Sequence, residues 1–167
     1  MLEQREQRSK VTQFDRNGER PLRGRPPDAV RTPPHSDEAE WGVLGSMLVN
    51  PRDICSEMIG SEMFYNPMNR TIYLVLVEMF NQRKAIDLIT VTNELRDRNL
   101  LDSCGGAVYV TNLFTFVPTA ANIRYYAEIV RDKYLLREVI TGCTENVRVA
   151  YEEGMEIADV LEQALKH

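Results

Sequence analysis

Apolar residues recur every three to four positions from residue 36 onward, which is the spacing of one face of a helix. Polar or proline residues that favour a helix start precede these stretches at Ser36 or Asp37, Asn50–Pro51, Asn66–Pro67, Asp87 and Thr119. No stretch shows the apolar alternation of a half-buried strand. The pattern predicts an all-α fold: a globular helical bundle over residues 33–118, followed by a long helix and a helical hairpin over residues 119–167.

Each predicted helix of the bundle carries an apolar stripe. The first stripe is Trp41, Leu44, Met47 and Leu48. A short second helix is predicted from Pro51 to Gly60. The third helix carries Ile72, Leu76, Val77 and Phe80, and the fourth carries Ile89, Val91, Leu95 and Leu100. We expect Leu44, Leu76 and Phe80 to be buried. Gly42 and Gly45 each cost the first helix about 1 kcal/mol relative to Ala unless close packing requires them.

The long helix predicted from Ala120 to about Tyr151 carries two apolar stripes on a wheel of 100° per residue. One stripe stops halfway and is predicted to pack on the bundle: Ile123, Tyr126, Ala127, Val130 and Tyr134. The other runs the whole length: Tyr125, Ile129, Leu136, Ile140, Cys143, Val147 and Tyr151. The second stripe therefore needs a partner.

Part of that partner is predicted within the chain, because Gly154 can end the long helix and a returning helix follows. The returning helix is short and is expected to cover only half of the long stripe, while Leu135 and Val139 point elsewhere. A protein-interaction surface is therefore predicted at Tyr125, Ile129, Leu135, Leu136, Val139, Ile140, Val147, Tyr151, Ile157, Leu161 and Leu165.

The first 35 residues differ in composition from the rest. They hold eight Lys and Arg against five Asp and Glu and five of the eight prolines, with few large apolar side chains. Such a segment buries too little surface to offset the entropy of ordering, so residues 1–32 are predicted to form a disordered basic arm. Its charge of +3 leaves −8 on the remaining residues.

Four segments resemble the N-terminal domain of the bacterial DnaB-type replicative DNA helicases, in the same order along the chain. They are TPPHSDEAEWGVLGSMLVNP, FYNPMNRTIY, IDLITVTNELRDRNLLDSCGGAVYVTNL and VPTAANIRYYAEIVRDKYLLREVI. The resemblance covers residues 32–167 and implies a helical bundle followed by a hairpin. Asn69 and Gly42 depart from the residues common in that family.

The resemblance also implies a function in DNA replication. Paired hairpins would build the collar of a hexamer as a trimer of dimers, and the collar would dock the C-terminal helicase-binding domain of primase, with a helicase loader as a further partner. ATP, Mg²⁺ and most DNA contacts would belong to a separate ATPase domain. The chain lacks the G-x-x-x-x-G-K-[ST] loop that cradles phosphates, so no enzymatic activity and no cofactor are expected of these 167 residues.

Other chemistry finds little support in the sequence. The two histidines, His35 and His167, lie outside any ligand cluster. The acidic groups Glu38 with Glu40, and Glu152 with Glu153 and Glu156, are interpreted as first-turn carboxylates that favour the helix dipole and as solvated faces. Cys55, Cys104 and Cys143 suggest neither zinc nor disulfides. No catalytic or metal site is predicted. With no membrane-spanning run and no signal peptide, the chain is expected to be cytoplasmic.

One alternative function remains, a small helical nucleic-acid-binding protein that uses the Arg-rich arm and a helix-turn-helix-like element after Asp87. Residues 87–102 carry two Arg against four Asp and Glu, which is a poor charge balance for a recognition helix.

Overall fold

The computed structural model describes residues 31–50, 58–117, 119–151 and 157–164. The chain divides into the units Met1–Thr32 and Pro33–His167, and all elements below belong to the second. The elements are α1 (Asp37–Val49), the 3₁₀ turn η2 (Ser61–Met63), α2 (Pro67–Asn81), α3 (Leu88–Asp97), α4 (Gly106–Phe116), the 3₁₀ turn η3 (Ala120–Asn122), α5 (Ile123–Ala150) and α6 (Ile157–Ala164). Every element in these ranges is helical, which confirms the predicted all-α class. Residues 1–30 of the predicted arm and residues 51–57 of the predicted second helix lie outside the described residues.

The helix starts follow the predicted caps. The Ser36 hydroxyl accepts the Ala39 N–H, and Asn66 caps α2 with Pro67 in its first turn. Asp87 forms a full capping box with Thr90 at the start of α3. Gly105 adopts a φ of 83° before α4, a left-handed conformation that favours glycine. Local side-chain chemistry therefore fixes where these helices begin.

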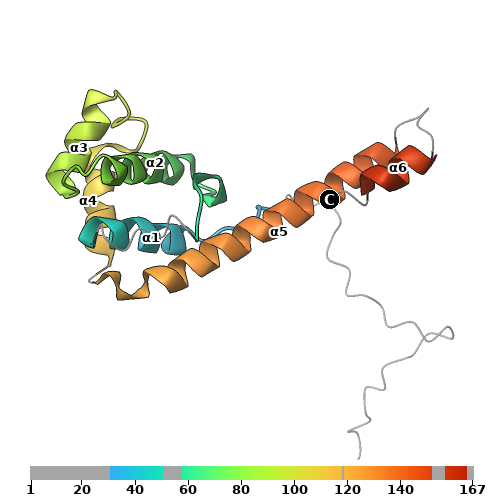
Figure 1. Ribbon diagram of the computed structural model, residues 1–167, viewed down its shortest axis with the longest axis horizontal. Helices are drawn as coiled ribbons and strands as arrows, with labels where there is room; N and C mark the ends of the chain where they lie inside the picture. The colour runs from blue at the N-terminus through green and yellow to red at the C-terminus, as the bar shows by residue number, and fades with distance from the viewer. Residues whose placement is uncertain (1–30, 51–57, 118, 152–156, 165–167) are drawn as a thin grey trace, which may run out of the picture. The chain divides into compact units, whose positions relative to one another are not determined.

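Helices α1 to α4, with the first half of α5, form the helical bundle that we call the body. Helix α1 lies at its centre and contacts α2, α4, η3 and α5 (Figure 1). Leu44, Met47 and Leu48 are buried on it, while Trp41 is half-buried. Gly42 and Gly45 allow these contacts. A Cβ on Gly42 would lie 2.6 Å from the Tyr126 ring, and one on Gly45 would lie 2.6 Å from the backbone oxygen of Leu113. Close packing of α5 and α4 explains both glycines.

Two predicted core residues are exposed instead. Phe80 is 40% exposed in the last turn of α2, because the buried face is centred on Ile72, Leu76 and Met79 and the next residue turns away by 100°. Ile89 is 72% exposed at the start of α3, since it precedes the buried Val91 by two residues and so lies on the opposite side of the helix. Both assignments to the buried face were wrong, Phe80 by one residue and Ile89 by two.

Leu76 lies in the middle of this core and is fully buried. Replacing Leu76 by Ala is expected to lower the free energy of unfolding by about 2 to 5 kcal/mol, from lost apolar burial and the cavity left behind. Chemical denaturation followed by circular dichroism measures the change. Leu74→Ala is the matched control, because Leu74 is half-exposed two residues earlier on the same helix. Equal losses in both variants would contradict the placement of the core.

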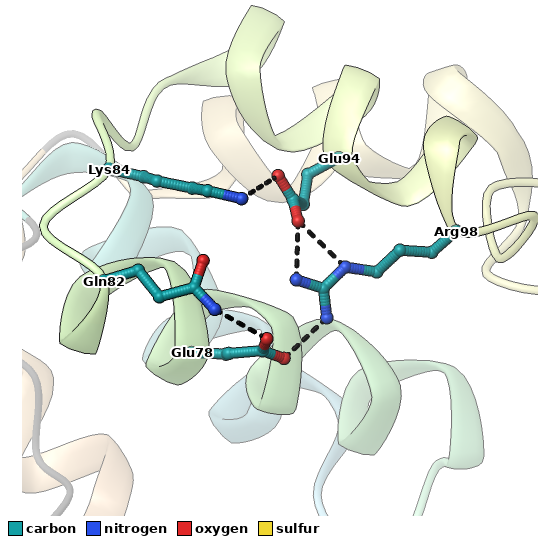
Figure 2. A network of polar contacts seen from close by, with 5 residues as sticks. All are labelled: Glu78, Gln82, Lys84, Glu94 and Arg98. Carbon is teal, nitrogen blue, oxygen red and sulfur yellow. Dashed lines mark hydrogen bonds and ion pairs between the residues drawn. The ribbon is translucent and has the colours of Figure 1, made fainter.

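An ion-pair network joins α2 to α3 (Figure 2). Arg98, the C-cap of α3, lies between two carboxylates: it bonds Glu94 on its own helix and Glu78 on α2. Lys84 also bonds Glu94, at 2.9 Å, and Gln82 bonds Glu78 at 2.8 Å. The hydrogen bonds from Arg98 and from Lys84 lower the pKa of Glu78 and Glu94 respectively. The network therefore holds both carboxylates ionised.

Acid is expected to weaken this link. A carboxyl group whose pKa is lower in the folded than in the unfolded chain stabilises the fold at pH values above its ordinary pKa of 4.5. This stabilisation is lost as the pH falls through the pKa of the folded state. The thermal midpoint of the wild-type chain should therefore fall more steeply between pH 5 and pH 3 than that of a Glu94→Gln variant. Calorimetry across this range makes the comparison, and parallel curves would show that the network does not contribute.

Candidate functional site

The first half of α5 belongs to the core of the body. Ile123, Ala127 and Val130 are buried against it, while Tyr126 and Tyr134 are half-buried. This confirms the predicted half-length stripe. The same helix then continues past the body, as Figure 1 shows, and its environment changes.

The middle of α5 is exposed on every side, since residues 138–141 are all exposed. Five large apolar side chains on α5 lie open after Tyr134, each between about half and two-thirds exposed. We call them the α5 surface: Leu135, Leu136, Val139, Ile140 and Val147. From Leu135 to Ile140 they span about 140° of the helix circumference at 100° per residue. An arc of this width is broader than the narrow seam with which a helix packs against a single partner in a coiled coil.

The returning helix does not cover the stripe for which it was predicted. Helix α6 packs along the last turns of α5 (Figure 1), where Val149 is only 3% exposed. Val147, two residues earlier and therefore on the opposite side of α5, is 57% exposed. The expectation that α6 shields half of the long stripe is thus wrong. Ile140 and Val147 are both left open.

The other predicted interface residues divide into three groups. Tyr125, Tyr151, Ile157 and Leu161 are exposed. Ile129 is partly buried and packs against the core of the body. Leu165 lies outside the described residues. The structure therefore brings most of the predicted set to the surface of α5 and α6, and their contact with a partner stays a prediction.

Arg137 marks the point where α5 leaves the body. Its guanidinium donates to the backbone oxygens of Pro34 at 2.8 Å and Met63 at 2.6 Å. It also lies 5.7 Å from the ring centroids of Tyr65 and Tyr134. The body contact of α5 therefore extends to Arg137, three residues before Ile140, rather than ending about one turn earlier at Tyr134.

Glu40 is a buried carboxylate that the sequence interpretation placed wrongly on a solvated face. It is 1% exposed and accepts hydrogen bonds from the Tyr65 N–H at 2.7 Å, the Asn66 N–H at 3.3 Å and the Asn69 side-chain amide at 2.8 Å. Its spacing of four and seven residues from Leu44 and Met47 places it on the core face of α1. That spacing was the signal for its burial.

The Glu40 network continues to the other side of the body. The Tyr109 hydroxyl donates to the Asn69 amide oxygen at 2.7 Å and accepts the Trp41 indole N–H at 2.9 Å. Burial raises the pKa of Tyr109, so its hydroxyl stays protonated as a donor. The chain of hydrogen bonds links α1, α2 and α4 and satisfies the polar groups of the core. Its arrangement is that of a structural network.

A shallow cavity of about 470 Å³ lies between α2 and the end of α3, lined by Leu74, Val77, Leu100, Thr71 and neighbouring side chains. Arg98 at its edge is held by two carboxylates, which leaves α3 poorly suited to phosphate binding. Within the described ranges, no group of three or more His, Cys, Asp or Glu side chains could hold a metal ion. None of the helices described is long and apolar enough to cross a membrane.

Known proteins match this chain over most of its length. It is 38% identical over 138 residues to the replicative DNA helicase DnaC of Bacillus subtilis (strain 168), which is 81% of this chain and 30% of that protein. It is 39% identical over 141 residues to the replicative DNA helicase DnaB of Mycobacterium leprae (strain TN), 82% of this chain and 23% of that protein. The chain thus spans about a third or less of these relatives.

A solved structure agrees with the sequence matches. The N-terminal domain of DnaB helicase from Mycobacterium tuberculosis superimposes with a TM-score of 0.76 at 37% identity, covering 81% of this chain and 96% of that one. The family model described as the DnaB-like helicase N terminal domain matches residues 32–132, which include the bundle and the first part of α5. The chain therefore belongs to the DnaB-like helicase N-terminal domain family.

Proposed function

We propose that this chain is the collar domain of a replicative DNA helicase, where it pairs subunits and docks primase. The observation that carries the proposal is the α5 surface, a set of apolar side chains on a helix that has left its own body. Monomeric proteins rarely expose contiguous apolar surface of this kind without a partner.

The width of the apolar arc indicates what kind of partner fits. One helix buries a stripe, whereas an arc of about 140° needs two. The α5–α6 hairpin of a second copy offers two helices, and it carries its own exposed apolar residues, Ile157 and Leu161 on α6. A symmetric pairing of hairpins would therefore cover the α5 surfaces of both copies.

The expected strength of this pairing is modest. Burying five half-exposed apolar side chains contributes about 1 kcal/mol each, or about 10 kcal/mol for a symmetric pair. Association costs about 4 to 15 kcal/mol in lost freedom. Because the free energy gained by burial and the cost of association are similar in size, we expect association that depends on protein concentration.

Primase docking would use the collar that the pairing builds, with a helicase loader as a further partner. ATP and Mg²⁺ enter this proposal only through a separate ATPase domain of a longer protein, since these 167 residues carry no phosphate-binding loop. DNA would be engaged mainly by that domain.

The test measures binding of the wild-type chain to the C-terminal helicase-binding domain of a primase. Binding to labelled single- and double-stranded DNA is measured separately, at low and moderate salt. The proposal expects saturable binding of the primase domain and no binding of DNA at moderate salt. Saturable DNA binding without primase binding would favour the nucleic-acid-binding alternative and overturn the collar assignment.

A further inference from the structure

A second feature of α5 lies at the border of the α5 surface. Arg137 is a half-buried cation, and within the described part of the chain it forms no ion pair. Its partners are two backbone oxygens and two aromatic rings. A guanidinium that is held by backbone oxygens from two separate segments ties those segments to its own helix.

The first of these segments is the short stretch before α1. Pro33 and Pro34 have no backbone N–H, so they cannot hold themselves in place by donating backbone hydrogen bonds. The backbone oxygen of Pro34 is instead held by Arg137 at 2.8 Å. His35 stacks on the Tyr65 ring, with centroids 4.3 Å apart and planes 20° apart. Arg137 approaches the same ring, so Tyr65 is shared by both residues.

The second segment is η2, whose Met63 oxygen accepts from Arg137 at 2.6 Å. The next residues, Phe64 and Tyr65, lead into the backbone N–H groups that Glu40 binds. Arg137 therefore closes a ring of contacts between α5, η2 and the stretch before α1. Among the described residues, Arg137 is the charged side chain that bonds both η2 and the stretch before α1.

We propose that Arg137 is a clasp that holds residues 33–36 against α5, and that a partner on the α5 surface tightens this clasp. Arg137 precedes Ile140 by three residues, so the two side chains are neighbours on the helix. A partner that covers Ile140 would exclude water from the edge of the guanidinium and strengthen its hydrogen bonds. This coupling rests on the proposed pairing function, whereas the clasp itself belongs to the single chain.

The clasp can be followed through the histidine ring protons, because the chain has only two histidines. The stacked Tyr65 ring should shift the NMR signals of His35 upfield, and a His167→Asn variant assigns them. In Arg137→Met these signals should move to the position of an exposed histidine, with helicity unchanged. Arg137→Lys, which can reach one backbone oxygen but not both, should give an intermediate shift.

Arg131→Met is the control, because Arg131 is exposed on the same helix and makes only a 3.7 Å contact with Asp132. It should leave the His35 signals in place. Retention of the upfield shift in Arg137→Met would overturn the clasp. So would global unfolding of that variant, since it would place Arg137 in the core rather than at a local contact.

Measuring self-association tests the coupling to pairing independently of the clasp itself. If pairing tightens the clasp, then by reciprocity Arg137→Met weakens self-association, by about fivefold or more. Equal self-association of the wild type and this variant would overturn the coupling. A wild-type chain that never associates would refute the proposed function and the coupling together, while the His35 signals would still decide whether the clasp exists.

Discussion

Replacing Glu40 by Ala is expected to lower the free energy of unfolding by about 3 to 5 kcal/mol. The substitution leaves three donors without their acceptor: the partly buried N–H groups of Tyr65 and Asn66 and the buried side-chain amide of Asn69. Each buried donor left unpaired costs about 1 to 3 kcal/mol, and relaxation or an entering water recovers part of that cost. Denaturant unfolding followed by circular dichroism measures the loss.

Glu38→Ala provides the matched control, since Glu38 is an exposed carboxylate in the same first turn of α1. Its removal should change stability by about 0.5 kcal/mol or less. Glu40→Gln should fall between the two, because its amide oxygen still accepts while its NH₂ group meets a donor. A Glu40→Ala variant as stable as Glu38→Ala would show that the carboxylate is dispensable for the fold.

The double variant Ile140→Asp with Val147→Asp is expected to weaken self-association by about a hundredfold or more and to reduce primase binding with it. A carboxylate desolvated at an apolar interface without a partner costs several kcal/mol. The body should stay folded, because both residues are about half exposed in the single chain. Light scattering, helicity and primase binding are measured on the same preparations.

Asn112→Asp with Asn122→Asp adds the same two charges at exposed positions outside the α5 surface. This control should associate like the wild type, which separates the effect of the surface from that of net charge. Unchanged association and unchanged primase affinity in a folded Ile140/Val147 variant would remove the α5 surface from the proposed interface. Loss of the body's fold would place both residues in its core.

The sequence predicted the features that depend on local chemistry. Side-chain caps at Ser36, Asn66 and Asp87 start their helices as expected, since an N-cap needs only its own first turn. The half-length stripe on α5 is also correct, because buried residues at Ile123, Ala127 and Val130 keep the helical period against one body.

The features missed by the sequence depend on contacts between distant segments. Glu40 is acidic and lies in a first turn, so its local context indicates a solvated position. Its spacing from Leu44 and Met47 places it on the core face of α1, but the donors that make burial of a carboxylate favourable come from residues 65–69, far away in the sequence. The side of α5 on which α6 packs, next to Val149, does not follow from the stripe on either helix alone. Apolar periodicity alone therefore predicted the hairpin but assigned α6 to the wrong face.

If the α5 surface pairs copies of this chain, the molar mass of the wild-type chain in solution depends on its concentration. Multi-angle light scattering should be recorded over a hundredfold range of protein concentration. We expect a mass that rises from 19.2 kDa toward twice that value or a higher multiple as the concentration increases. A mass that stays at 19.2 kDa over the whole range would contradict it.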